Sequence, residues 1–151
     1  MASPKISIIV AVYNAENTIL KCLDSISQQT FEDFEVIMVD DGSLDHSGEK
    51  IDEYASRDSR FKAFHKSNGG VSSARQFGID HASGEYSIHV DPDDWIAPGM
   101  LASLYAQAGK ADMVICDFYI NSYKGQEYVE QQPQNVEDNM AVIKDLFGHL
   151  H

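Results

Sequence analysis

Short apolar runs alternate with segments of helical periodicity over most of the chain. Runs rich in Ile, Val and Phe occupy residues 5–13, 34–39, 61–65, 86–90 and 112–118. Each run is shorter than a buried helix needs to be, and continuous apolar runs of this length are typical of strands covered on both faces. The pattern therefore predicts five buried strands.

Helices are expected between these runs. Asn14 can cap the first helix, and Ser43 or Asp45 can open the second. The third is predicted over residues 71–82, and a fourth over about residues 98–108. Because strands that alternate with helices form parallel sheets, the predicted fold class is α/β, a doubly wound sandwich.

The pattern changes after Tyr119. Lys124-Gly125 is typical of a hairpin turn, and residues 136–150 have the periodicity of an amphipathic helix. That helix finds no apolar partner in the sequence, so we expect the natural protein to continue past His151. The predicted organisation is a first portion over residues 1–118 and the start of a second over residues 119–151.

Composition and charge narrow the class of protein. The 151 residues are 43% hydrophobic, enough for one domain with a core, and the formal net charge of −13 argues against a nucleic-acid partner. No apolar stretch approaches the roughly 20 residues of a membrane span, and no secretory leader is evident, which favours a cytoplasmic protein. Cys22 and Cys116 lack the spacing of a zinc or redox pair and are expected as core thiols.

Two acidic groups follow predicted strands. Asp91-Pro92-Asp93-Asp94 comes after the run at residues 86–90, and Asp40-Asp41 comes after the run at residues 34–39. Clustered carboxylates repel one another, and oxygen ligands of this kind suit Mg²⁺ or Mn²⁺ together with substrate phosphates. An acidic turn that caps a helix is the alternative interpretation.

The carboxyl ends of parallel strands form one ligand-binding edge. Tyr13 there could stack on a nucleobase, an Asp could accept the imide N–H, and Arg75 could contact the base or a phosphate. Gly69-Gly70 leaves backbone amides free at a helix start, which favours an anion. Asp93 or Asp94 would hold the metal. Together these features describe a site for a nucleoside diphosphate.

Each feature also has a purely structural interpretation. Tyr13 could be an aromatic residue at the end of a strand, Gly69-Gly70 a hinge, and Arg75 a surface ion-pair partner. Their order along the chain and their shared position at strand ends favour the functional interpretation.

Four stretches in this order resemble family 2 glycosyltransferases with the GT-A fold. They are Ile6-Ser7-Ile8-Ile9-Val10-Ala11-Val12-Tyr13-Asn14, Val39-Asp40-Asp41-Gly42-Ser43-Leu44-Asp45, Asn68-Gly69-Gly70-Val71-Ser72-Ser73-Ala74-Arg75, and Asp91-Pro92-Asp93-Asp94. The resemblance covers roughly residues 5–118. It implies a GT-A (Rossmann-like) three-layer sandwich with a mostly parallel central sheet.

The resemblance also implies an activity. Such enzymes transfer a sugar with inversion from a nucleotide-sugar donor, often a UDP-sugar, to an acceptor hydroxyl, assisted by Mn²⁺ or Mg²⁺. Relatives mostly build surface polysaccharides, which implies a saccharide or lipid-linked acceptor and a location in the cytoplasm, at the inner membrane face.

The resemblance assigns roles to individual residues. Tyr13 and Asp41 would hold the base, and Arg75 would contact the base or the phosphates. Glu16 would reach the nucleoside. The remaining acids are those of the Asp-x-Asp motif, with Asp91 near the nucleotide and Asp93 and the neighbouring Asp94 as metal ligands.

Three positions depart from the family pattern without removing a charge or a ligand. Ala11 stands where the family has Pro, Gln76 where it has Asn, and Pro92 occupies the variable place of Asp-x-Asp.

The general base that inverting transfer requires lies, by the same resemblance, beyond His151. Glu137 and Asp138 are the nearest acids in the chain, but they are typical of a first helical turn and are not assigned as the base. The chain is therefore predicted to be the donor-binding portion of a longer enzyme, with the second portion beginning the acceptor side.

Rival classes fit less well. A nicotinamide-dependent oxidoreductase would carry its glycine fingerprint after the first strand, where this chain has Tyr13-Asn14-Ala15-Glu16. A phospho-accepting receiver domain would place its acidic pair there too. A non-catalytic nucleotide- or metal-binding module, lacking the base, stays open as an alternative.

Overall fold

The computed structural model describes residues 3–109, 112–122 and 124–130, and the chain divides into two compact units between Ala106 and Gln107. In chain order the elements are β1 (Ile6–Val12), α1 (Ile19–Ser27), β2 (Phe34–Asp40), α2 (Ser47–Arg57), β3 (Phe61–His65), α3 (Val71–His81), β4 (Tyr86–His89), α4 (Met100–Gln107), β5 (Phe118–Ser122) and β6 (Gly125–Val129).

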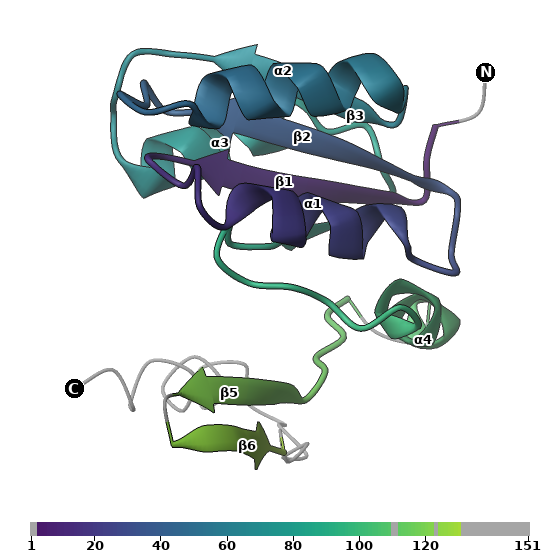
Figure 1. Cartoon of the computed structure of the whole chain (residues 1–151). Helices are drawn as coiled ribbons and strands as arrows, with labels where there is room; N and C mark the ends of the chain where they lie inside the picture. Colours follow the sequence, from purple (N-terminus) through teal and green to yellow (C-terminus); the bar gives the residue numbers. More distant parts are fainter. Residues whose placement is uncertain (1–2, 110–111, 123, 131–151) are drawn as a thin grey trace. The chain divides into compact units, whose positions relative to one another are not determined.

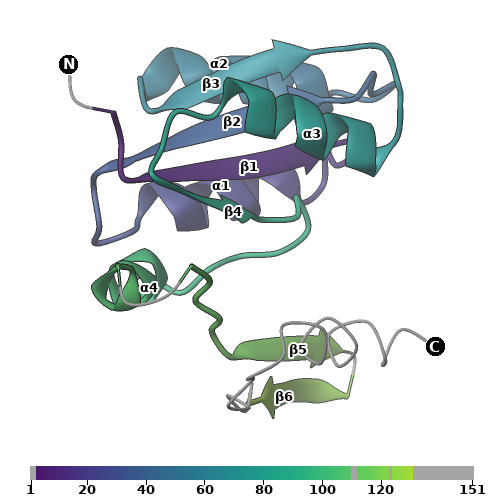
Figure 2. The same ribbon diagram turned by 180° about the vertical axis from the view of Figure 1, so that it is seen from behind.

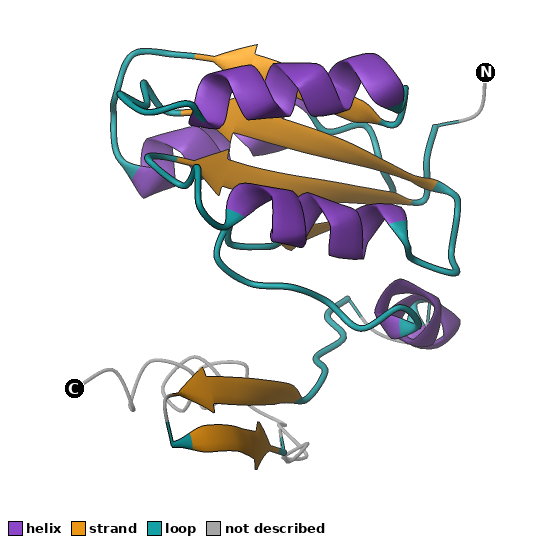
Figure 3. Cartoon of the chain, viewed as in Figure 1, coloured by secondary structure: helices purple, strands orange, loops and turns teal. Residues whose placement is uncertain are grey.

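The central sheet has four parallel strands in the order β3-β2-β1-β4 (Figure 1 and Figure 3). The chain runs outward from β1 through β2 to β3, and then crosses to the other side of β1 to form β4. All four carboxyl ends therefore lie at one edge of the sheet, with a change of direction at β1.

Helices cover both faces of this sheet. α1 and α2 lie on one face, and α3 lies on the other, as the two opposite views show (Figure 1 and Figure 2). Alternate residues of β1 feed the two apolar layers: Ile8 and Val10 pack toward α1 and α2, whereas Ile9 packs with Ala74 of α3. Burial on both faces is the reason that these strands read as unbroken apolar runs.

Most of the predicted architecture is confirmed. The α/β class, the parallel sheet and the three layers are present, α3 occupies Val71–His81, and the hairpin turn at Lys124-Gly125 joins β5 to β6. The second helix begins later than predicted, at Ser47, because Asp45 lies in the preceding loop, where its Oδ1 accepts the Ser47 N–H at 2.9 Å.

The fifth predicted strand is wrong. Residues 112–117 form no strand, and β5 begins at Phe118 and pairs antiparallel with β6 in a separate two-stranded sheet. The hairpin pairs residues 118–122 with residues 125–129, so only the last residue of the predicted strand, Phe118, takes part in it. Cys116 consequently is exposed instead of buried, although Cys22 is buried as expected. The helix predicted over residues 136–150 lies outside the described residues.

None of the helices in the described ranges combines the length and the apolar character that crossing a bilayer requires.

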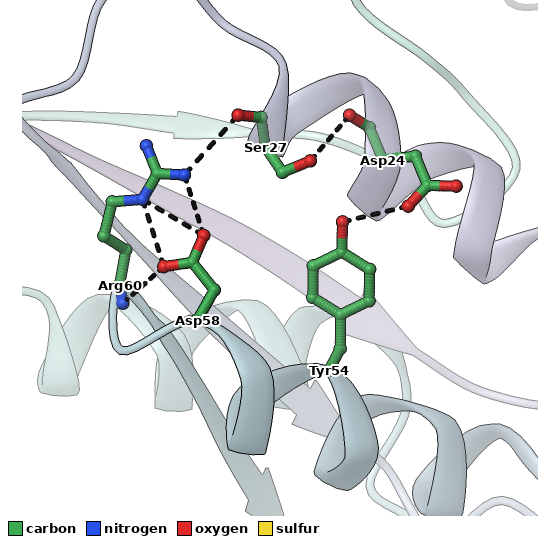
Figure 4. A network of polar contacts seen from close by, with 5 residues as sticks. All are labelled: Asp24, Ser27, Tyr54, Asp58 and Arg60. Atoms are coloured by element: carbon green, nitrogen blue, oxygen red, sulfur yellow. Dashed lines mark hydrogen bonds and ion pairs between the residues drawn. The ribbon is translucent and has the colours of Figure 1, made fainter.

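A polar cluster ties α1 to α2 and to the turn before β3 (Figure 4). The Tyr54 hydroxyl of α2 donates to Asp24 of α1 at 3.0 Å, and Arg60 donates to the Ser27 carbonyl at 3.4 Å while it pairs with Asp58 at 2.7 Å. These polar contacts orient α1 relative to α2 and the turn before β3, in addition to the apolar contacts that hold α1 on the sheet.

Glu35 is a buried carboxylate at the amino end of β2. Its Oε1 accepts hydrogen bonds from the Ser7 hydroxyl at 2.6 Å and from the N–H and hydroxyl of Ser83, and Lys62 pairs with its Oε2 at 2.7 Å. A Cβ at Gly84 would lie 2.6 Å from the Ser7 nitrogen, so only glycine allows this close approach to β1. Glu35 thus joins β1, β2, β3 and the turn before β4.

Burial alone would raise the pKa of Glu35, but the hydrogen bonds from Lys62, Ser7 and Ser83 outweigh it and lower the pKa to about 2. We expect Glu35→Gln to lower the free energy of unfolding by about 2 kcal/mol near neutral pH. Because the folded-state pKa is depressed, this contribution is present above the unfolded-state value and is lost as pH falls toward about 2. Urea unfolding at about pH 7 and about pH 3 measures it.

The exposed Glu32, just before β2, supplies the control for this measurement. Glu32→Gln should leave the unfolding free energy nearly unchanged at both pH values. A Glu35→Gln chain as stable as Glu32→Gln near neutral pH would show that the cluster does not stabilise the sheet.

Candidate functional site

A cavity of about 440 Å³ opens at the carboxyl edge of the central sheet, within the range of small-molecule sites. The residues that line it come from the ends of β1, β2 and β4, from the β3–α3 connection and from the first half of α3. They are Ala11, Val12, Tyr13, Asp41, Asn68, Gly70, Val71, Ala74, Arg75, Asp91, Pro92 and Asp93.

Tyr13 presents a half-exposed ring to this cavity, 49% of the residue being accessible to solvent. Asn14 then adopts a left-handed backbone conformation, with φ at 48°, which Asn tolerates better than most residues. Its N–H donates to the Ser43 hydroxyl at 3.0 Å, and its side-chain oxygen accepts the Leu44 N–H at 2.8 Å. The loop after β1 is therefore held against the loop after β2, which fixes the backbone next to Tyr13.

Asp41 lines the cavity from below and is itself almost fully buried. Lys66 donates to its carboxylate at 2.6 Å, and the N–H groups of Gly69 and Gly70 donate at 3.0 and 2.7 Å. Burial would raise the pKa of Asp41, but these three donors outweigh it and hold the pKa below its usual value. The Gly69 N–H is shared between both carboxylate oxygens, at 3.0 Å from Oδ1 and 3.2 Å from Oδ2, so Asp41 is ionised and rigidly held.

The neighbouring Gly42 allows the β3–α3 connection to approach the loop after β2 closely. Its φ of 74° belongs to the left-handed region, and a Cβ there would lie 3.0 Å from the Asn68 nitrogen. The sequence predicts Gly69-Gly70 and Arg75 at this edge, without a separate role for Lys66 or Asn68. A basic residue directly after a predicted strand and ahead of a glycine pair is the signal that could have identified Lys66.

Asp40, next to Asp41, holds the end of the sheet together. His65 at the end of β3 contacts Asp40 at 3.0 Å through Nδ1 and Asp52 of α2 at 2.9 Å through Nε2. The hydrogen bonds to Asp52 and Asp40 raise the pKa of His65. The two neighbouring acids thus have different roles: Asp40 bonds to His65 of β3, whereas Asp41 lines the cavity.

Arg75 lines the same cavity from the first half of α3. Its Nη2 donates to Asp91 Oδ1 at 2.6 Å, and both side chains are partly exposed. Its Nε is buried and has no hydrogen-bond partner in the part of the chain that the structure describes. Because buried donors are rarely left unpaired, this N–H is available to an acceptor on a ligand.

The acidic turn after β4 is closed by a hydrogen bond from the Asp94 N–H to the Asp91 carbonyl at 3.0 Å. Asp91 and Asp93 line the cavity, whereas Asp94 lies beside its lining. Burial, followed by the charges of Asp93 and Asp91, raises the pKa of Asp94. Three carboxylates thus crowd one turn, and Arg75 neutralises only the first of them.

This donor set fits a divalent cation that is shared with a ligand. Among the described residues, no group of three or more His, Cys, Asp and Glu side chains converges to hold a metal by itself. Mg²⁺ commonly uses one or two carboxylates and completes its shell with phosphate oxygens and water. The oxygen-only turn at Asp91, Asp93 and Asp94 meets that requirement.

Glu16 lies outside the cavity lining. Its carboxylate accepts the His46 N–H at 3.1 Å, and its own N–H donates to Asp45 at 3.0 Å. The structure therefore brings together five of the seven residues expected at the site, and Glu16 and Asp94 are outside the cavity lining.

The sequence matches the family described as glycosyl transferase family 2 over residues 7–148. It is 43% identical over 154 residues to the uncharacterized glycosyltransferase EpsJ of Bacillus subtilis (strain 168), covering 98% of this chain and 44% of that protein. The chain thus spans less than half the length of this relative.

Two solved structures show the same fold. S. aureus TarS 1-349 in complex with UDP-GlcNAc is 33% identical with a TM-score of 0.66, over 70% of this chain and 31% of that one. The mannosyltransferase PcManGT from Pyrobaculum calidifontis, in complex with GDP-Man and Mn²⁺, is 26% identical with a TM-score of 0.62, over 72% and 33% of the two chains. With a GT-A sandwich, a cavity at the carboxyl edge of its sheet and a family match along nearly its whole length, this chain belongs to glycosyl transferase family 2.

Proposed function

We propose that this chain forms the donor site of an enzyme that transfers a sugar from a nucleotide-diphosphate sugar, a UDP-sugar, to an acceptor hydroxyl with inversion. The observation that carries the proposal is the single cavity that gathers Tyr13, Asp41, Arg75, Asp91 and Asp93. The similarity of this chain to TarS, which was solved with UDP-GlcNAc, supports a uridine nucleotide as the ligand.

In this proposal the nucleobase of the donor lies between Tyr13 and Asp41. The half-exposed Tyr13 stacks on the nucleobase, and the ionised Asp41 accepts the imide N–H. Lys66 and the two glycine amides hold the Asp41 carboxylate in place, so the acceptor is oriented before the ligand arrives.

The diphosphate lies toward Arg75 and the acidic turn. The Nε of Arg75 donates to a phosphate oxygen, while its Nη2 keeps Asp91 in position. Asp93 and the neighbouring Asp94 would hold Mn²⁺ or Mg²⁺, and Asp91 would lie near the nucleotide. When bound, the cation stabilises the negative charge that develops on the leaving diphosphate.

The general base is not assigned to any residue of this chain, and we propose that it lies in the part of the longer enzyme that the chain does not span. The acceptor is proposed to be a saccharide or lipid-linked hydroxyl in surface polysaccharide synthesis, at the cytoplasmic face of a membrane. A non-catalytic nucleotide-binding module is the second candidate, because this chain covers only 44% of EpsJ. Donor turnover distinguishes the two functions.

Asp93→Asn tests the metal end of the site. We expect it to weaken UDP binding in the presence of Mn²⁺ by about tenfold or more, and to change UDP binding in EDTA by less than twofold, because the amide is a poorer ligand for a hard cation. Isothermal titration of UDP with Mn²⁺ and with EDTA measures both affinities.

The exposed Asp33, in the loop before β2, supplies a matched charge-removing control. Asp33→Asn should bind UDP as the unsubstituted chain does under both conditions. Equal losses in Mn²⁺ and in EDTA for Asp93→Asn would contradict a metal role for this carboxylate.

Arg75→Lys tests the phosphate contact. Lysine keeps the positive charge but lacks Nε and the planar fork, so we expect UDP to bind about tenfold more weakly both with and without metal. Uridine, which has no phosphate, should bind the variant and the original chain equally well. Arg57→Lys, an exposed change on α2, is the control and should leave UDP affinity unaltered.

A further inference from the structure

The acidic turn belongs to a stretch without regular secondary structure. Residues 90–99, between β4 and α4, form no helix or strand, so no ladder of backbone hydrogen bonds holds the carboxylates in place. This connection runs along α1 before it reaches α4 (Figure 1 and Figure 2). Besides the Arg75 contact with Asp91 and the hydrogen bond from the Val90 N–H to the Ile9 carbonyl, the contacts that α1 makes with this connection help to set where the acidic turn lies.

Two side chains of α1 bracket the turn. The buried Cys22 thiol donates to the Asp91 carbonyl with a sulfur–oxygen distance of 3.5 Å, at the beginning of the turn. Three residues along the helix, the Ser25 hydroxyl accepts the Ile96 N–H at 3.1 Å, just beyond the end of the turn. Residues at this spacing share one side of a helix, so both contacts come from the same face of α1.

Gln29, just after the end of α1, continues this row of contacts. Its side chain is buried, and its Nε2 donates to the Ala97 carbonyl at 2.7 Å and to the Ser25 carbonyl at 3.1 Å. Its Oε1 accepts the Leu101 N–H at 3.0 Å. That N–H lies in the first turn of α4, where backbone donors lack partners within the helix. One amide group therefore links the end of α1 to the start of α4.

The apolar face of α1 does not require these groups. Ile19, Leu23 and Ile26 already pack in the main core and hold the helix on the sheet. A buried amide must be desolvated, and it is favourable only where its hydrogen bonds are made. Ser25 bonds to Ile96, and Gln29 bonds to Ala97 and to Leu101 at the start of α4. These three residues follow the acidic turn in the chain.

We propose that Ser25 and Gln29 are positioning residues for the acidic turn: they fix the place of the Asp91 and Asp93 carboxylates and so determine the affinity for the cation–diphosphate end of the donor. The inference rests on the proposed donor site. The proposed nucleobase site depends on other contacts, those of Asp41 with Lys66 and the glycine amides. It is independent of the contacts made by Ser25 and Gln29.

The test compares UDP binding by the 151-residue chain in Mn²⁺ and in EDTA for Ser25→Ala and Gln29→Met. We expect UDP affinity in Mn²⁺ to fall about 10-fold for Ser25→Ala and about 10- to 100-fold for Gln29→Met, as is typical when groups that orient metal ligands are removed. UDP affinity in EDTA should stay within about twofold of the original value. Ser25→Thr, which keeps the hydroxyl, should retain Mn²⁺-dependent binding.

The chain offers a matched control for each change. Ser27 makes the same hydrogen bond to the carbonyl three residues before it as Ser25 does, without an amide of the connection as partner, and Gln28 is an exposed glutamine beside Gln29. Ser27→Ala and Gln28→Met should bind UDP normally in both conditions. If Gln29→Met does not fold, Ser25→Ala still removes the contact with the Ile96 N–H, and Ser27→Ala accounts for the loss of the hydrogen bond within the helix.

The outcomes separate the two levels of the proposal. If the unsubstituted chain binds UDP no better in Mn²⁺ than in EDTA, the proposed donor site is wrong and this inference fails with it. If the unsubstituted chain responds to Mn²⁺ and Ser25→Ala and Gln29→Met respond equally well, the positioning role alone is overturned. Equal losses in Mn²⁺ and EDTA would also overturn it, because they indicate a general effect on the fold.

Discussion

The position of β1 between two parallel neighbours is the constraint on which the rest of this structure depends. β1 pairs with β2 on one side and with β4 on the other, and the chain changes direction across it. Tyr13, Asp41 and Asp91 follow three different strands, yet this topology brings them to one edge. A cavity with an aromatic wall and an acidic wall is the direct consequence of the strand order.

Within that cavity the charges are already partly paired. Lys66 binds Asp41, Arg75 binds Asp91, and the other carboxylates of the acidic turn are left for a cation. The cavity lining consequently combines a fixed, ionised acceptor, Asp41, with acids of a turn whose carboxylates repel one another. A nucleoside diphosphate with a bound cation has the matching distribution of charge, and this match links the fold to the proposed function.

The sequence alone was sufficient for features that depend on local pattern. Unbroken apolar runs located four parallel strands, and acids directly after them located the site, because burial on both faces and strand-end placement leave clear signals. Features that depend on distant partners were not visible: Ser25 and Gln29 read as ordinary helix positions, and Glu16 looked available to a ligand although it binds the loop before α2. The run at residues 112–117 resembled a strand, but a run shows no sign of whether a pairing partner exists.

The central claim is that one cavity binds both a uridine nucleotide and its cation. A crystal of this chain grown with UDP and Mn²⁺, with anomalous diffraction recorded at the manganese edge, tests it most directly. The account predicts a manganese peak coordinated by Asp93 or Asp94 and by diphosphate oxygens, with the uracil ring against Tyr13 and hydrogen-bonded to Asp41. Manganese or UDP bound away from this cavity, or UDP in the cavity with manganese elsewhere, would contradict it.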